Sequence, residues 1–170
     1  MSAHNNKGLD LLLALIKAWA LLGGLLLLAV VLMTTYSTLA GFLISQPFPG
    51  DFELTQMGVA VAVFSFLPYC QLTFSNVSAD IFTSRAGPVT VRNLNRLGSL
   101  IALFFSTFLI WRMYAGMLDY QIYREVTTIL QIPLWYAFVP ALFSLLLLLI
   151  ASLITLRYPQ GSINSPLTGI

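Results

Sequence analysis

Charged side chains at the edges of long apolar runs are the first candidates for chemistry in this sequence. Arg112 lies inside one such run, and Asp119 follows it seven residues later. Seven residues make two helical turns, so the two side chains would share one helix face and could form a salt bridge. Arg112 could instead extend its charged end to the nearest polar interface, or pair with a partner subunit. Each interpretation makes Arg112 a contact residue and none makes it a catalyst.

Asp80 is a second acidic candidate, near the end of another apolar run. Arg85 follows it five residues later. An ion pair with Arg85 or a neighbouring arginine is the ordinary role of such a carboxylate. A contact with a partner protein is the alternative.

Residue types that carry catalysis or hold cofactors are scarce. His4 is the only histidine and lies in the polar N-terminal segment, and Cys70 is the only cysteine. Membrane haem sites need axial ligands within the helices, and zinc sites depend on histidine and cysteine. We therefore expect no catalytic residue, no cofactor and no metal site in this chain. The net charge of +2 gives no indication of a nucleic-acid partner.

Four apolar runs must position these residues. Hydrophobic residues make up 58% of the 170 residues and charged residues only 8%, against about 25% charged residues in soluble domains. A helix needs about 20 apolar residues to cross the hydrocarbon core of a membrane. The sequence thus predicts an all-α integral membrane protein with a single domain, residues 1–158, and a flexible C-terminal tail, residues 159–170. The four predicted transmembrane helices cover residues 18–44, 54–82, 97–118 and 133–156.

Two short amphipathic helices at the membrane surface are predicted in addition. The first, Leu9–Lys17, continues into an apolar run that is longer than that of a signal peptide, so we expect a retained first helix. The second lies within residues 119–131, where Ile122, Val126, Ile129 and Leu130 recur at helical spacing.

The connection between the first two runs has the composition of a tight turn. It contains Pro47, Pro49 and Gly50. Asp51 is predicted to cap the next helix. Glu53 would lie in the first turn of that helix, where the helix dipole favours a negative charge.

Small residues at a spacing of four predict close contacts between helices. Three rows have this spacing: Gly58 with Ala62, Gly98 with Ala102 and Ser106, and Ala137 with Ala141.

The basic residues predict the orientation. Six of the eight fall on the side of both termini and the second connection: Lys7, Lys17, Arg85, Arg92, Arg96 and Arg157. The positive-inside rule places that side, and therefore both termini, in the cytoplasm. Contacts with anionic lipid headgroups are expected for Lys17, Arg85, Arg92 and Arg96. The outer connections are acidic, through Asp51, Glu53, Asp119 and Glu125.

Three short motifs join the predicted helices. They are Asp51-Phe52-Glu53-Leu54, Asn76-Val77-Ser78-Ala79-Asp80-Ile81-Phe82 and Leu130-Gln131-Ile132-Pro133-Leu134-Trp135-Tyr136. In this order and spacing, and with four spans, the chain resembles the small permease subunit of tripartite ATP-independent periplasmic (TRAP) transporters. The resemblance covers roughly residues 48–156.

The resemblance implies a sodium-coupled importer of organic acids (carboxylate or sialic-acid-like) in the inner membrane of a bacterium or archaeon. A periplasmic substrate-binding protein captures the substrate, and a large permease subunit holds the substrate and sodium sites. The small subunit binds the large one, helps to fix its scaffold in the membrane among the lipids, and adds docking surface for the periplasmic protein. The candidate subunit or docking contacts are Asp51, Glu53, Asp80, Arg112, Asp119, Arg124 and Glu125.

Two other functions stay open. A membrane anchor of a redox or enzymatic complex predicts a bound chromophore, or helix histidines in a partner chain. A stand-alone small transporter is disfavoured because no acidic residue lies in mid-membrane, although Gln71 and Asn76 are polar.

Overall fold

The computed structural model describes residues 3–73 and 88–157. These residues form four helices: α1 (Ala3–Ile44), α2 (Asp51–Leu72), α4 (Pro88–Ile122) and α5 (Trp135–Arg157). All four are long and apolar enough to cross a membrane, which confirms the predicted class and number of spans. Asp80, Arg85, most of the predicted extension of the second span to residue 82 and the C-terminal tail lie outside the described residues.

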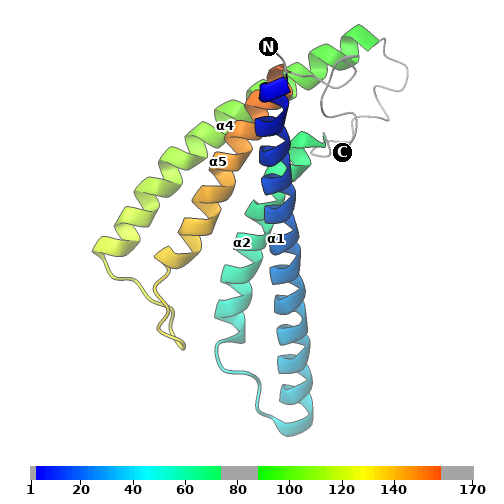
Figure 1. Ribbon diagram of the computed structural model, residues 1–170. Helices are drawn as coiled ribbons and strands as arrows, with labels where there is room; N and C mark the ends of the chain where they lie inside the picture. The colour runs from blue at the N-terminus through cyan, green and yellow to red at the C-terminus, as the bar shows by residue number, and fades with distance from the viewer. Residues whose placement is uncertain (1–2, 74–87, 158–170) are drawn as a thin grey trace.

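Figure 1 shows two helical hairpins that meet at one end and diverge toward the other. α1 lies beside α2, α4 lies beside α5, and α2 and α5 join the two hairpins. The diverging end carries the connections 45–50 and 123–134, and we call it the loop end. The opposite end holds the start of α1 and the end of α5, and we call it the terminal end.

The first helix is longer than the first predicted span. The segment Leu9–Lys17, predicted to continue the first span as a short helix at the membrane surface, is continuous with the rest of α1. Its Ile16 is fully buried against Leu72 of α2 and residues of α5, including Ala151. The segment therefore belongs to the bundle, because its apolar side packs against other helices.

The contact between α1 and α2 depends on two glycines. A Cβ atom at Gly23 would lie 2.6 Å from the Ser65 Cβ, and one at Gly58 would lie 2.5 Å from the Val30 Cγ2. Such distances mean that the helix backbones approach more closely than larger side chains allow. The Gly58–Ala62 row is confirmed as a contact face, and Ala62 is fully buried. Gly98 differs, because no other helix of the described ranges places an atom within 4 Å of the position of its Cβ.

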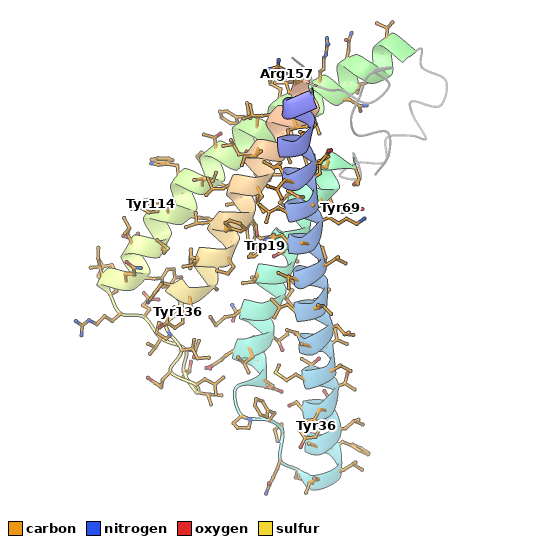
Figure 2. The ribbon with its side chains drawn as sticks, in the orientation of Figure 1. Trp19, Tyr36, Tyr69, Tyr114, Tyr136 and Arg157 are labelled. Carbon is orange, nitrogen blue, oxygen red and sulfur yellow. The ribbon has the colours of Figure 1, made fainter. Side chains whose placement is uncertain are left out.

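The most buried span is α5, and the least buried is α4. In their most apolar windows, 39% of α5 is buried but only 6% of α4. A polar contact helps to hold α5 in the centre: the Trp19 indole N–H of α1 donates to the Ser144 hydroxyl at 2.8 Å. The Trp19 ring also meets the Phe143 ring edge-on, with centroids 4.6 Å apart, and Figure 2 shows Trp19 directed toward α5.

A buried polar cluster ties three helices together. The Gln71 amide of α2 donates to Thr155 Oγ1 of α5 at 3.1 Å and to Ser99 Oγ of α4 at 3.5 Å. The two hydroxyls are themselves 3.0 Å apart. Each hydrogen bond between membrane helices contributes about 0.6 kcal/mol on average. These side chains belong to the last turns of α2 and α5 and the first half of α4, so the cluster fastens the hairpins where they converge.

Candidate functional site

The α4–α5 connection, residues 123–134, does not form the amphipathic helix predicted within residues 119–131. α4 itself ends at Ile122, and the following chain makes an irregular hairpin in which Val126 pairs with Pro133. The Thr127 N–H donates to the Ile132 carbonyl at 2.9 Å. Arg124 and Gln131 have φ angles of 50° and 55°, which a right-handed helix does not accommodate. The apolar periodicity in this segment therefore does not mark a helix.

The irregular shape of this connection follows from its contact with the first turn of α2. The Ile129 N–H donates to Glu53 Oε1 at 2.6 Å, and the Leu130 N–H donates to Glu53 Oε2 at 3.0 Å. The Thr127 hydroxyl and the Thr128 amide also interact with this carboxylate. Backbone amides that bind Glu53 are not available for helical hydrogen bonds, which explains the irregular loop. Glu53 lies in the first turn of α2, as predicted, and only 9% of its surface is exposed.

Leu130 makes a second contact between the two loops. Its side chain lies over Gly50, so a Cβ atom at Gly50 would be 2.5 Å from Leu130 Cγ. Gly50 precedes α2 with φ 78° and ψ 13°, a left-handed conformation that glycine adopts at little cost. The Leu130 side chain therefore packs on the turn before α2, and the glycine at residue 50 allows both the backbone conformation and the close contact.

Asp51 has a different role from the predicted helix cap. The cap residue is Gly50, no side chain caps this helix, and Asp51 is the first residue of α2. One carboxylate oxygen of Asp51 accepts the Phe52 N–H at 2.6 Å, and the other accepts the Ser37 hydroxyl of α1 at 2.5 Å. Ser37, fully buried, in turn accepts the Phe48 N–H at 3.0 Å. Asp51 thus holds the 45–50 turn against α1.

The other charged candidates near the loop end are exposed. Arg112 and Asp119 lie on α4, and Arg124 and Glu125 lie in the connection 123–134. Within the described part of the chain, no ion pair joins Arg112 to Asp119. The structure therefore brings Asp51 and Glu53 into contacts within the chain and leaves the other four side chains accessible.

The basic candidates for lipid contacts that the structure describes belong to segments toward the terminal end. Lys17 on α1 and Arg96 on α4 are exposed, Arg92 belongs to the first turns of α4, and Arg85 lies outside the described residues. Arg157 ends α5 and is labelled in Figure 2. Contacts of Lys17, Arg85, Arg92 and Arg96 with lipid headgroups stay a prediction.

Sequence reasoning missed the partners of the acidic residues. Ser37 gave no signal, because hydroxyl side chains also occur at Thr34, Thr35 and Thr38 beside it, and its partner Asp51 lies 14 residues away in the sequence. The partners of Glu53 are backbone amides, which no residue type reveals. The motifs 51–54 and 130–136 are the sequence features that pointed to this region, and one residue of each, Glu53 and Leu130, form a hydrogen bond with one another. In the described ranges, no group of three His, Cys, Asp or Glu side chains is placed to hold a metal ion.

One family comparison matched the chain. The sequence model described as "Tripartite ATP-independent periplasmic transporters, DctQ component" matches residues 30–159. This range contains α2, α4 and α5, the final part of α1 and both connections of the loop end. No curated protein sequence and no solved structure matches the chain.

Proposed function

Because this chain belongs to the DctQ family of tripartite ATP-independent periplasmic (TRAP) transporter components, we propose that it is the small scaffold subunit of a sodium-coupled importer of organic acids. In this role it binds a large permease subunit, which carries the substrate and sodium sites, in the inner membrane. The substrate class is a carboxylate or sialic-acid-like compound. The family match carries the proposal, since it extends over both hairpins.

The exposed apolar surface of α4 supports binding to a larger membrane subunit. Its large exposed side chains include Leu97, Leu100, Ile101, Phe104, Phe105, Phe108 and Trp111. A span with so little of its surface buried within its own chain is covered by lipid or by other helices. A transporter with further components supplies such helices. We propose that α4 contributes to the contact with the large subunit.

The charge distribution supports a periplasmic location for the loop end. Lys17, Arg96 and Arg157 lie toward the terminal end together with one exposed acid, Asp10. The exposed charges near the loop end are two acids and two arginines: Asp119, Glu125, Arg112 and Arg124. The positive-inside rule then places the terminal end in the cytoplasm. Exposed carboxylates at the loop end would attract a basic patch on a periplasmic substrate-binding protein, mainly by raising the rate of encounter.

Reversal of these two charges tests the docking role. With Asp119→Lys and Glu125→Lys combined, we expect the concentration of periplasmic protein that gives half-maximal uptake to rise severalfold. The maximal rate should change little, because neither side chain lies in the transport pathway proposed for the large subunit. Uptake into proteoliposomes, titrated with the periplasmic protein, measures both quantities.

Asp10→Lys is a suitable control, because Asp10 is an exposed carboxylate on α1 near the terminal end. This variant should leave the titration curve unchanged. Co-purification with the large subunit should be normal for both variants. An unchanged half-maximal concentration in the doubly reversed variant would remove Asp119 and Glu125 from the docking surface.

A further inference from the structure

Consecutive backbone amides of the α4–α5 connection converge on one carboxylate. The backbone amides of Thr128, Ile129 and Leu130 all interact with the Glu53 carboxylate, and the Thr127 hydroxyl is a fourth partner. Successive N–H groups that converge on one point form a nest, a concave arrangement that binds anions. Here the anion is a side chain from another hairpin of the same chain.

The hydrogen-bond pattern requires a carboxylate specifically. The Ile129 N–H donates to one oxygen and the Leu130 N–H donates to the other. A carboxylate accepts on both oxygens, whereas the amide of glutamine offers one acceptor and one donor. Glutamine at residue 53 would therefore place its NH₂ group against a backbone N–H. Glutamate and glutamine have nearly the same shape, so the site tells them apart by their charge and by their hydrogen-bond acceptors.

Burial separates Glu53 from the exposed acids of the same region. Glu53 is 9% exposed. The two residues whose amides it binds, Ile129 and Leu130, follow it by 76 and 77 residues in the sequence. An accessible carboxylate such as Glu125 can meet a partner directly, but Glu53 cannot do so while its two oxygens are occupied. Its influence on a partner must act through the position of the loop.

We propose that residues 127–130 form a carboxylate-binding nest, that the Glu53 side chain is its resident ligand, and that this contact holds the α4–α5 loop in the shape to which the periplasmic protein docks. The last part rests on the docking role proposed above. Glu53 is accordingly a positioning residue. The nest connects the two hairpins at the end where their helices diverge (Figure 1).

Hydrogen exchange of the complete chain, bound to the large subunit in lipid nanodiscs, tests the nest. In both Glu53→Gln and Glu53→Ala, the amides of Ile129 and Leu130 should exchange at least about tenfold faster, because charge-assisted hydrogen bonds are lost. Glu125→Gln is the matched control, since Glu125 lies in the same connection and is exposed. It should leave the exchange of these two amides unchanged.

Chemical rescue adds a readout that simple loss of packing would not affect. Formate supplies a free carboxylate, so it should restore slow exchange in Glu53→Ala, where the side chain leaves space. Chloride at the same concentration and ionic strength should not. Protection that survives in Glu53→Gln, or a failure of formate to act on a loosened Glu53→Ala loop, would overturn the carboxylate nest.

Uptake measurements separate the nest from the docking role. If both inferences hold, Glu53→Gln should raise the half-maximal concentration of periplasmic protein severalfold with little change in maximal uptake. If Glu53→Gln accelerates exchange of the loop amides but leaves the uptake titration unchanged, the nest is supported and its role in docking is overturned. A loop that remains protected would overturn the nest, whatever the charge reversals at Asp119 and Glu125 show.

Discussion

Replacing Gly23 with alanine should destabilise the α1–α2 hairpin by about 1–3 kcal/mol, the usual cost of overpacking a close contact. The added Cβ would lie 2.6 Å from the Ser65 Cβ and 3.4 Å from the Ala62 carbonyl oxygen. Both atoms are fixed to the backbone of α2, so no rotation of a side chain relieves the contact. The helices must move apart, which loosens the packing on both sides of Gly23. Unfolding in mixed detergent micelles, followed by far-UV circular dichroism, measures the loss.

The neighbouring glycine provides the control for this prediction. At Gly24 an added Cβ would meet only the Phe66 ring at 3.9 Å, an ordinary contact. Gly24→Ala should therefore be neutral or slightly stabilising, because alanine favours the helix. Ser65→Gly combined with Gly23→Ala should recover part of the lost stability. If Gly23→Ala and Gly24→Ala lost the same amount of stability, the close helix contact at Gly23 would not be the cause of the loss.

Gly50→Val should destabilise the loop end by about 2–5 kcal/mol, through two separate effects. Valine adopts φ 78° only with strain, because its branched side chain meets its own backbone. Its Cβ would also lie 2.5–2.6 Å from atoms of the Leu130 side chain. The displaced Leu130 would pull the loop amides away from Glu53. Limited proteolysis within residues 123–134 should therefore accelerate together with the loss of global stability.

A pair of milder variants separates strain from contact. Gly50→Ala in the Leu130→Ala background removes the clash and keeps only the backbone cost of about 1–2 kcal/mol. Gly50→Ala alone should cost more than this. If the background makes no difference, the Leu130 side chain does not rest on Gly50 in the membrane.

The spans could be predicted because hydrophobicity is a local property. Apolar runs of sufficient length required four helices, and the described residues contain four helices long and apolar enough to cross a membrane. The spacing of Ile122, Val126, Ile129 and Leu130 failed as a helix signal for a physical reason. Leu130 is apolar because it covers Gly50, and the amides of the segment bind Glu53. Periodicity cannot distinguish a helix face from contacts made with a distant turn.

The roles of the acidic residues could be predicted only in part. Sequence position placed Glu53 correctly in the first turn of α2. It could not separate the buried Glu53 from the exposed Glu125, because burial depends on how the hairpins meet. Asp51 was expected to be the cap residue of α2, but Gly50 holds that position, and Asp51 accepts hydrogen bonds from the Phe52 N–H and from Ser37 of α1. In both cases the missing information was a contact between segments that are distant in sequence.

Reconstituted uptake tests the proposed scaffold role most directly. Proteoliposomes with an inward sodium gradient would contain the large permease subunit, with or without this chain, and receive the periplasmic protein loaded with a radiolabelled organic acid. We expect uptake only when all three components are present, and none from liposomes that contain this chain alone. Transport by this chain alone, or full-rate uptake without it, would contradict the role of a required, non-transporting scaffold subunit.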